Sequence, residues 1–584
     1  MCGIISYNGV DNAIPYLTRG IKALEYRGYD SFGCCIEDQG SMIVYKDVGR
    51  IDGVLKKYSI DQKNSNRAIF HTRWATHGGI EKKNSHPHTD CSGKIAVVHN
   101  GIIENWVHLK KGIDSHSFQS DTDTEIIPHM IEEYLKHNND LVDAVKAVAR
   151  KLVGMSSFVV MHADFPYMVA YKNGSPLVMG IGENGHFISS DVPSLIHFTN
   201  NFVFLHDGDL ITFWNDRYEI SNLFGKGYEY RTETVSMNPV NLEKGSHKHY
   251  MEKEIYEQPL IWKKFEEPDY ENFKEASTLI MDSDKVYIIG SGSSYHAALF
   301  GSKLFLSKGI LATAVNGEEI LDYSNVIDDK TVFIVISQSG ETADLISSLS
   351  IFNNVRKIGI INVPSSSLAR NVEILLKMKA GVEKAVPATK SFTNSLIILN
   401  ILAEMVGVKE SSMDNDLIIA NNEIHNFLVP SVMNNIDYAA KTIYRMKSVF
   451  LAGRGNSYLF AMEGALKLKE CTYIHSEALD LSGLKHGPLS LVDDNTWIIS
   501  IVTKENMTES LMNIQELKSR GANIIGISSE NSELFDIFIR VPNLKSYSFL
   551  PIIMVLQFLA YKVALLKNIN PDMPRNLAKS VTVR

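Results

Sequence analysis

The chain has 584 residues with a formal net charge of -9, and 45% of them are hydrophobic and 21% charged. This length exceeds what one hydrophobic core supports and predicts about three domains of a globular protein. The acidic balance argues against a basic surface for nucleic acid, so we expect no nucleic-acid partner.

The cysteine spacing and the lengths of the apolar runs bear on where in the cell the protein is found. The five cysteines are irregularly spaced and form no CxxC pair, so the sequence predicts neither a disulfide framework nor a metal site. No basic segment followed by an apolar one opens the chain, and no apolar run approaches the ~20 residues of a membrane span. We therefore expect a cytoplasmic protein without a membrane partner.

The chain begins Met1-Cys2-Gly3, and this start is its first candidate for chemistry. Removal of Met1 would leave Cys2 with a thiol and a free α-amine. Because an α-amine titrates near ~8, it can take the thiol proton directly or through one water. Cys2 is therefore a candidate N-terminal nucleophile, although a cysteine after the initiator also occurs without any function.

The pattern of residues 2–240 predicts an α+β domain, because short apolar runs alternate with helical stretches and Gly-containing turns. Residues 241–270 are predicted to hold a polar linker and a lead-in helix over 250–265. The strands expected in the first domain are 3–7, 68–71, 94–99, 157–162 and 168–171, and the helices are 124–136 and 140–152.

The remainder of the chain repeats itself. Residues 286–295, 331–335 and 357–361 are echoed by 449–458, 496–500 and 523–527, each about 165 residues later, which is a domain-sized period. Continuous apolar strands alternate with helices in both copies, which is typical of buried parallel sheets. The sequence therefore predicts two doubly wound α/β domains, 271–425 and 426–570, followed by a tail over 571–584.

Five segments of the first domain are dense in polar residues and glycine: 27–31, 71–78, 86–88, 99–101 and 122–124. In this order behind an N-terminal cysteine, they resemble the N-terminal-nucleophile (Ntn) glutamine amidotransferases. The resemblance implies an Ntn amidohydrolase sandwich that hydrolyses L-glutamine to glutamate and ammonia. It implies Cys2 as nucleophile, Asn100 and Gly101 as the oxyanion hole, and Trp74 as the gate to an ammonia path. The glutamine-binding residues that it implies are Arg73, Thr76, His77 and Asp123.

Simpler interpretations of these residues stay open at this stage. Arg73 and Asp123 also suit a surface ion pair, Trp74 a core aromatic, and Asn100-Gly101 a turn. The histidines within 71–88 lack the regular spacing of a zinc site, so we interpret them as structural. No metal and no organic cofactor is expected.

Two glycine-rich turns follow strands in the second half. The turn Ser337-Gln-Ser-Gly-Glu-Thr342 offers hydroxyls, an amide and helix N–H groups that could surround a phosphate, although such residues are also good helix caps. The turn over 290–294 lacks the third glycine and the acidic residue of a dinucleotide fingerprint, which argues against NAD.

The context favours phosphate, because these turns resemble those of SIS (sugar isomerase) domains. Two SIS domains behind an amidase resemble the glutamine–fructose-6-phosphate aminotransferase family, as do residues 249–259, 463–470, 484–488 and 574–583. The resemblance implies that ammonia is channelled to fructose 6-phosphate, giving glucosamine 6-phosphate, in a homodimer. The sugar-phosphate-binding residues that it implies are Ser293, Ser294, Ser337, Gln338, Ser339, Thr342 and Val386, and the channel residues are Trp74, Ala578 and Val581.

The resemblance also implies catalytic roles in the second half. His486, from the neighbouring subunit, would open the sugar ring, and Lys579 would form an imine with the open ketose. Glu470 would move a proton between C1 and C2, with Lys467 beside it. Glu463, Lys467 and Glu470 share one helix face by spacing, which is also the pattern of an exposed ion-pair ladder.

Three departures from the family pattern leave the ketose open: Ser291 to Ser294 in the first turn, Pro387-Ala388, and Ser482-Gly483 before Leu484. One alternative is therefore a paralogue that aminates a different ketose phosphate. A second alternative is a non-catalytic sugar-phosphate-binding protein, which would have lost Cys2, Glu470 and Lys579. Amidotransferases of the phosphoribosyl or asparagine-forming kind need motifs that this sequence lacks.

Overall fold

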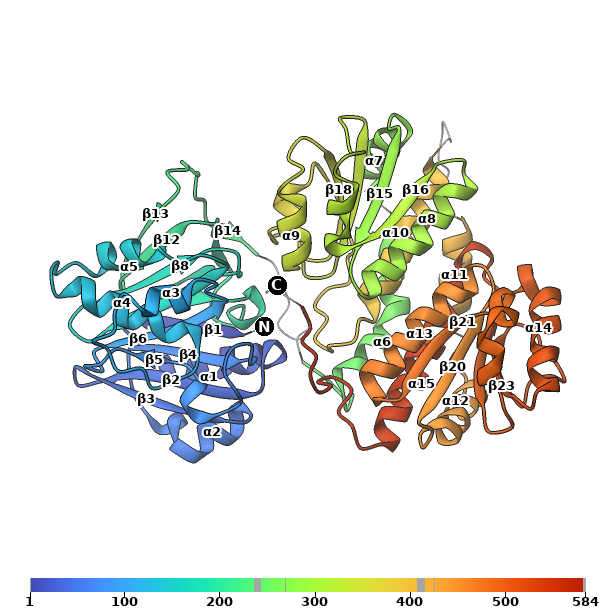
Figure 1. The fold of residues 1–584 in the computed structure, drawn as a ribbon, viewed down its shortest axis with the longest axis horizontal. Helices are drawn as coiled ribbons and strands as arrows, with labels where there is room; N and C mark the ends of the chain where they lie inside the picture. Colours follow the sequence, from blue (N-terminus) through green and yellow to red (C-terminus); the bar gives the residue numbers. More distant parts are fainter. Residues whose placement is uncertain (1, 236–242, 268, 407–414, 425, 581–584) are drawn as a thin grey trace. The chain divides into compact units, whose positions relative to one another are not determined.

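A computed structural model describes residues 2–235, 243–267, 269–406, 415–424 and 426–580 (Figure 1). The chain forms two compact units, 1–243 and 244–577, with residues 341–343 and 578–584 grouped with the first. The predicted boundaries at 240 and 425 fall on or beside residues outside the described ranges.

The first unit contains an eight-stranded and a six-stranded antiparallel sheet. The strand that begins after Cys2, β1 (Gly3–Gly9), lies inside the larger sheet between β4 (Arg67–Arg73) and β10 (Gly185–Ser189). The other strands of the larger sheet are β2 (Ser31–Asp38), β3 (Ser41–Val48), β9 (Val178–Gly182), β11 (Asn201–Phe204) and β14 (Glu233–Thr234). The smaller sheet consists of β5 (His88–Thr89), β6 (Ile95–Gly101), β7 (Ser156–His162), β8 (Met168–Lys172), β12 (Asp209–Phe213) and β13 (Tyr218–Asn222).

The two sheets pack face to face around one apolar core. Ile4 and Ile69 from the larger sheet share this core with Val98, Val159 and Ala170 from the smaller one. Helix α1 (Ala13–Ala23) packs on β1 and β4, while α4 (Ile126–Leu135) and α5 (Leu141–Ala149) cover the outer face of the smaller sheet. Short helices α2 (Ile51–Tyr58) and α3 (Trp106–Lys110) complete the unit. The predicted α+β sandwich is confirmed.

The second unit contains two five-stranded parallel sheets with equivalent strand order, β16-β15-β17-β18-β19 and β21-β20-β22-β23-β24. Their strands are buried apolar runs with helices on both faces, so the two predicted doubly wound domains are confirmed. The first sheet consists of β15 (Lys285–Gly290), β16 (Ala312–Asn316), β17 (Thr331–Ser337), β18 (Arg356–Ile361) and β19 (Ile374–Lys377). The second consists of β20 (Ser448–Gly453), β21 (His475–Asp480), β22 (Trp497–Val502), β23 (Asn523–Ser528) and β24 (Ile537–Arg540).

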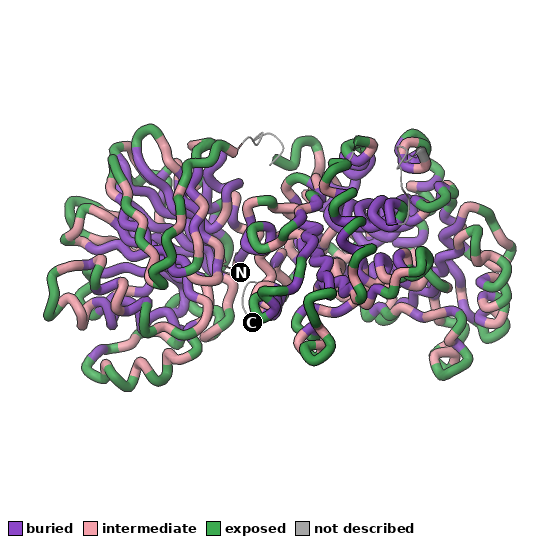
Figure 2. Tube along the Cα trace, turned by 90° about the horizontal axis from the view of Figure 1, so that it is seen from above, coloured by how far each residue is buried: buried purple, intermediate pink, exposed green. Residues whose placement is uncertain are grey.

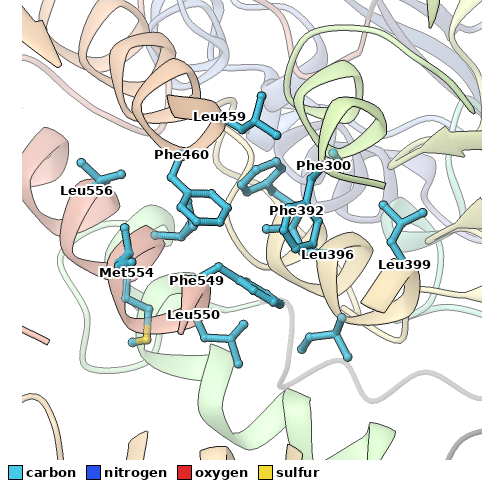
Figure 3. Packing of buried hydrophobic residues seen from close by; sticks show 14 of the residues in the cluster. Phe300, Phe392, Leu396, Leu399, Leu459, Phe460, Phe549, Leu550, Met554 and Leu556 are labelled. Atoms are coloured by element: carbon cyan, nitrogen blue, oxygen red, sulfur yellow. The ribbon is translucent and has the colours of Figure 1, made fainter. Parts of the chain in front are cut away.

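One helical layer is shared by the two sheets of this unit. Aromatic side chains from three helices meet there, with the ring centroids of Phe300 and Phe549 5.2 Å apart and those of Phe300 and Phe460 5.8 Å apart (Figure 3). Figure 2 shows buried residues in purple in the interior of both units. Its helices are α6 (Tyr250–Trp262), α7 (Tyr270–Met281), α8 (Ser293–Ser307), α10 (Lys390–Met405), α12 (Pro430–Ile443), α13 (Asn456–Thr472) and α15 (Phe549–Leu566). Helices α9 (Ala343–Leu349) and α14 (Met507–Ser519) lie on the outer faces, and α11 (Asn415–Ile424) precedes α12.

The apolar helix α15 corrects one expectation from the sequence. The 22 residues Lys545–Leu566, which include α15, have a window with mean hydropathy 2.1, so by length and composition alone this helix could cross a membrane. However, 83% of that window is buried inside the protein, against α6, α12 and α13. A helix that is apolar all round is expected where neighbours surround it.

Matching turns follow the first strand of each repeat. Gly292 and Gly455 have φ of 58° and 62°, and each precedes the first residue of a helix, α8 or α13. A Cβ on Gly290 would lie 2.6 Å from the backbone of Ser294, and one on Gly453 would lie 2.3 Å from that of Ser457. Glycine is therefore required where the helix starts against the strand. The same backbone device in both domains supports the duplication inferred from sequence.

Candidate active sites

Cys2 lies at the start of β1, beside the end of β4. The N–H of Trp74 donates to the Cys2 sulfur at 3.3 Å, and the thiol faces the Trp74 carbonyl oxygen at 3.5 Å. The Cys2 carbonyl accepts from Arg27 Nε and from Asn100 Nδ2, both at 3.2 Å. Two side chains therefore hold the backbone of Cys2, the candidate nucleophile, and the backbone of Trp74, directly after β4, contacts its sulfur.

Asn100 and Gly101 lie at the end of β6, and the Asn100 side chain contacts Cys2. The Asn100 amide is oriented by His71, whose Nε2 lies 3.2 Å from the Asn100 Oδ1, and its nitrogen also donates to Ser190 Oγ at 2.9 Å. Gly101 has φ of 135°, and a Cβ there would lie 2.0 Å from the Met155 carbonyl oxygen. The structure thus brings the predicted nucleophile and oxyanion-hole residues together.

The predicted glutamine-binding residues Arg73, Thr76 and His77 lie on β4 and the loop after it. The buried Arg73 guanidinium donates to the carbonyl oxygens of His77, Gly78 and Gly79 at 2.5 to 3.2 Å. Burial lowers the pKa of Arg73, while the nearby charges of Cys2, Asp30 and Asp123 act in the opposite direction. Thr76 is exposed and His77 half-buried.

Asp123 begins the short 3-10 helix Asp123–Glu125 and is 4% exposed. Its Oδ2 accepts from the Ile103 N–H at 2.7 Å, two residues after Gly101. Because Asp123 also contributes to the field at Arg73, which in turn feels the charge of Cys2, the structure places two opposite charges close to each other. This arrangement suits a zwitterion, whose carboxylate and ammonium need such a pair.

The channel candidates are only partly described. Trp74 is half-buried, and its ring contacts Tyr29 edge-on with centroids 5.5 Å apart. Ala578 is half-buried, and Val581 lies outside the described residues.

Neutral histidines support the amidase residues from within the sandwich. Burial lowers the pKa of His71 to about 3 and that of His86 well below its usual value. The two rings stack with centroids 4.1 Å apart, and the His99 N–H donates to His86 Nδ1 at 3.3 Å. These histidines therefore pack and donate or accept hydrogen bonds as uncharged rings.

Helix α13 carries a buried network of ions in the second unit. Lys467 Nζ lies 2.5 Å from Glu470 Oε2 and 3.4 Å from Glu463 Oε1, and the side chains of Lys467 and Glu463 are each 1% exposed. Burial alone would lower the pKa of Lys467, but Glu470 and Glu463 outweigh it and hold that pKa above its usual value. Glu463 and Lys467 are therefore part of a buried ion network and not of an exposed ion-pair ladder.

The start of α8 completes this network from the first repeat. The Ser293 hydroxyl donates to Glu463 Oε1 at 2.8 Å and accepts from Lys467 Nζ at 3.2 Å. His296, one turn later, lies 2.7 Å from Glu463 Oε2 through its Nδ1. Ser294 is adjacent on the same first turn. Lys467 thus contacts both Ser293 and Glu470 and connects the first repeat with the second. The spacing of residues in the sequence did not predict this connection.

The predicted phosphate turn follows β17. The buried Ser337 hydroxyl accepts from the Gly340 N–H at 3.0 Å, which folds the turn back on its strand. A Cβ on Gly340, whose φ is 65°, would lie 1.8 Å from Ser366 Oγ. Gln338, Ser339 and Thr342 are half-buried around this turn.

The remaining catalytic candidates lie on the tail and on a surface turn. The Val386 N–H donates to the Asp572 carbonyl at 3.0 Å, and the Asp572 carboxylate accepts from the first two N–H groups of α6 at 2.8 Å. The tail is thus anchored shortly before Lys579, which is half-buried. His486 ends the 3-10 helix Leu481–His486 and is exposed in this single chain.

Sequence reasoning missed Arg27, Ser190, His296 and Asp572 as supporting residues. Arg27 lies in a polar segment that the sequence did single out, and His296 follows the glycine-rich turn by one helical turn. Ser190 and Asp572 are joined to their partners across 90 and 321 residues or more, so no local pattern marks them.

Comparison with known proteins covers both units. A SIS domain model matches residues 279–405 and 442–537, and a glutamine amidotransferase domain model matches residues 71–197. The glutamine–fructose-6-phosphate aminotransferases (isomerizing) of Thermococcus kodakarensis and Pyrococcus horikoshii are each 39% identical over 602 residues, covering 100% of this chain and 100% of those proteins.

A solved structure is similar to the second unit. The C-terminal domain of glucosamine-fructose-6-phosphate aminotransferase from Francisella tularensis has a TM-score of 0.50 and 33% identity, covering 56% of this chain and 99% of that one. The alignment with the two full-length relatives spans the whole of this chain, including its sandwich and both SIS domains. The chain therefore belongs to the glutamine–fructose-6-phosphate aminotransferase (isomerizing) family.

Proposed function

We propose that this chain transfers the amide nitrogen of L-glutamine to fructose 6-phosphate and isomerises the adduct, giving glutamate and glucosamine 6-phosphate. The full-length identity to enzymes of that name carries the proposal. Two arrays of buried polar residues, one at Cys2 and one on α13, support it because each half of the reaction needs its own site.

In the first half-reaction, the α-amine of a mature Cys2 takes the thiol proton and the sulfur attacks the glutamine amide carbon. Asn100 and Gly101 supply N–H donors for the oxyanion, each worth a few kcal/mol in a dry site. The C–N bond breaks as the nitrogen is protonated, which releases ammonia and leaves a thioester. Water then attacks the thioester, releasing glutamate and restoring the thiol.

In the second half-reaction, His486 assists ring opening and the Lys579 amine condenses with the C2 carbonyl, releasing water. Ammonia replaces the lysine at C2. Glu470 then removes a proton from C1 and returns one to C2 while C1 becomes the aldehyde. The contact of Lys467 with Glu470 supports this role, because it holds the carboxylate in one position.

Two further parts of the proposal concern assembly and ammonia. The exposure of His486 supports a homodimer in which this residue acts in the site of the neighbouring subunit. Ammonia that met bulk water would be protonated and lost as a nucleophile, so we propose a protected route that begins at Trp74 and includes Ala578. A cytoplasmic location stays a prediction.

A product assay tests the reaction and the identity of the ketose. The purified chain is incubated with glutamine and fructose 6-phosphate, and the sugar is identified by mass spectrometry; other ketose phosphates are tested in parallel because Ala388 departs from the family pattern. Glucosamine 6-phosphate as the preferred product supports the proposal. Faster turnover of another ketose phosphate would favour the paralogue, and no amino sugar from any ketose would refute both.

Isotope labelling tests the protected route. With glutamine labelled by ¹⁵N in the amide and excess unlabelled ammonium in the buffer, the amino sugar is expected to carry ¹⁵N almost completely. Cys2→Ala should form no labelled product. Dilution of the label to the level of the bulk ammonium would contradict the route while leaving the chemistry at Cys2 intact.

A further inference from the structure

Four metal-binding side chains that neither site uses meet in the first unit. Cys91 follows β5, His116 lies between α3 and the 3-10 helix at Asp123, and His129 and Glu132 are one turn apart on α4. One ligand atom from each residue lies within 4.8 Å of the other three.

Four of the distances between these atoms are close to those of a tetrahedral zinc site. Cys91 Sγ lies 3.5 Å from His116 Nδ1 and 3.6 Å from His129 Nδ1. Glu132 Oε2 lies 3.1 and 3.7 Å from the same two nitrogens. With Zn–S of about 2.3 Å and Zn–N or Zn–O of about 2.0–2.2 Å, tetrahedral ligands are about 3.3–3.6 Å apart. One ion therefore fits between the four atoms with small side-chain shifts.

The outer nitrogens of both rings face carboxylates. His116 Nε2 lies 3.0 Å from Glu133 Oε2, and His129 Nε2 lies 3.6 Å from Glu125 Oε1. Metal-bound histidines commonly direct their other N–H to a carboxylate, which fixes the tautomer so that the ligating nitrogen carries a lone pair. Here both Nδ1 atoms are turned toward the thiol and both Nε2 atoms toward acids.

Burial and charge are also suitable. The imidazoles of His116 and His129 are 2% and 1% exposed, whereas Cys91 is exposed and gives an ion access from solvent. One thiolate and one carboxylate neutralise a divalent cation, so the loaded site buries no net charge. The thiolate and imidazoles select zinc over magnesium or calcium, which prefer oxygen ligands.

We propose that Cys91, His116, His129 and Glu132 bind a structural Zn²⁺ ion. Four protein ligands leave no open position, so the ion joins segments and does not take part in catalysis. It would link the turn after β5 to α4 and to the segment before Asp123, where Glu125 accepts from the N–H groups of Gln119 and Ser120 at 2.7 Å. This proposal revises the expectation of no metal site, which was based on the absence of a CxxC pair from the sequence.

Metal analysis of the full chain tests the proposal. All variants carry Cys2→Ala, so that zinc on the other half-buried thiol is not counted. After dialysis against a weak chelator, the Cys2→Ala protein should retain about one zinc per chain, as expected for a closed four-ligand site. Adding Cys91→Ala or His129→Gln should remove it, whereas the exposed His137→Gln, two residues after α4 ends, should not. Equal zinc content in the Cys91→Ala and control proteins would overturn the proposal.

A second measurement needs no ligand variant to fold. Cobalt(II) loaded into the Cys2→Ala protein should show a thiolate-to-cobalt charge-transfer band in the near ultraviolet and the intense visible bands of tetrahedral coordination. Cobalt spectra without the thiolate band would overturn the proposal. Zinc binding here does not depend on the proposed reaction, so failure of either can be told from failure of the other.

Discussion

The two SIS repeats share one backbone but carry different side chains at corresponding positions. Counted from the matching glycines of their first turns, Glu463, Lys467 and Glu470 on α13 correspond to Phe300, Leu304 and Ser307 on α8. The second repeat therefore has a buried ion network where the first has a largely apolar helix face.

The turns after the third strand of each repeat, β17 and β22, also differ, but here the first repeat carries the polar residues suited to a ligand. Ser337, Ser339 and Gly340 of the first repeat correspond to Val502, Lys504 and Glu505 of the second. The first repeat thus retains a turn suited to an anion, and the second retains acid and base groups. The comparison indicates that duplication supplied two equivalent scaffolds, and we propose that these took separate tasks, one in binding the phosphate and one in acid-base chemistry.

The largest expected effect is the loss of Lys467. Lys467→Met would leave Glu463 and Glu470 without their cation, and breaking a buried ion pair on one side costs about 3–5 kcal/mol. We expect the second unit to unfold at a markedly lower denaturant concentration, measured by circular dichroism, and at a lower temperature, measured by calorimetry. The proposed aminotransferase activity should be lost as well.

Two control substitutions make the Lys467 result specific. Lys469→Met changes an exposed lysine on the same helix, and Leu304→Met changes the corresponding position of the first repeat. Exposed substitutions stay within about 0.5 kcal/mol and volume-conserving apolar ones cost under about 1.5 kcal/mol. A Lys467→Met protein as stable as these controls would mean that the ions do not hold α13 against α8.

A comparable loss, in rate rather than stability, is expected for Glu470→Gln. The amide keeps the shape of the carboxylate but cannot remove a proton, and a general base contributes about 10²- to 10⁴-fold to a rate. Amino-sugar formation should fall by that factor while glutamine hydrolysis stays near the wild-type rate. Ser307→Ala, at the corresponding place in the first repeat, serves as the control. Equal loss of both activities would contradict a role confined to the sugar.

Much of this arrangement could be predicted because it is local. Three pairs of apolar segments, repeated about 165 residues apart, predicted both parallel sheets. The spacing of Glu463, Lys467 and Glu470 predicted that these residues share one helix face. The sequence could not show that this face is buried, since burial depends on the start of α8, which lies more than 160 residues away and supplies Ser293.

Contacts between distant segments explain what was missed. Asp572 caps the first turn of α6 across 321 residues or more, and an aspartate in a tail shows no local sign of such a partner. The proposed zinc ligands are likewise gathered from three places in the chain, with only His129 and Glu132 close in sequence. The expectation that no apolar run approaches a membrane span missed α15, and the burial of this helix likewise comes from α6, α12 and α13, which are distant in sequence.

The smallest effect in this comparison is expected at Gly340, the glycine of the phosphate turn that the second repeat replaces by Glu505. Gly340→Ala places a Cβ on a residue with φ of 65°, against Ser366 Oγ. A left-handed conformation costs a non-glycine residue about 1–2 kcal/mol, which corresponds to a roughly 5- to 30-fold change in an equilibrium. We therefore expect the KM for the ketose phosphate to rise by about that factor.

The controls for Gly340 separate the anion site from general damage. The KM for glutamine should not change, and Glu505→Ala, at the exposed corresponding position of the second repeat, should leave both constants unchanged. Shortening the neighbour in Gly340→Ala/Ser366→Gly removes the clash but not the backbone strain, so it should recover only part of the lost affinity. If Gly340→Ala instead lowered turnover with an unchanged KM for the sugar, the turn would act on α9 or the sheet rather than on the phosphate, and the division of tasks between the repeats would fail at its first half.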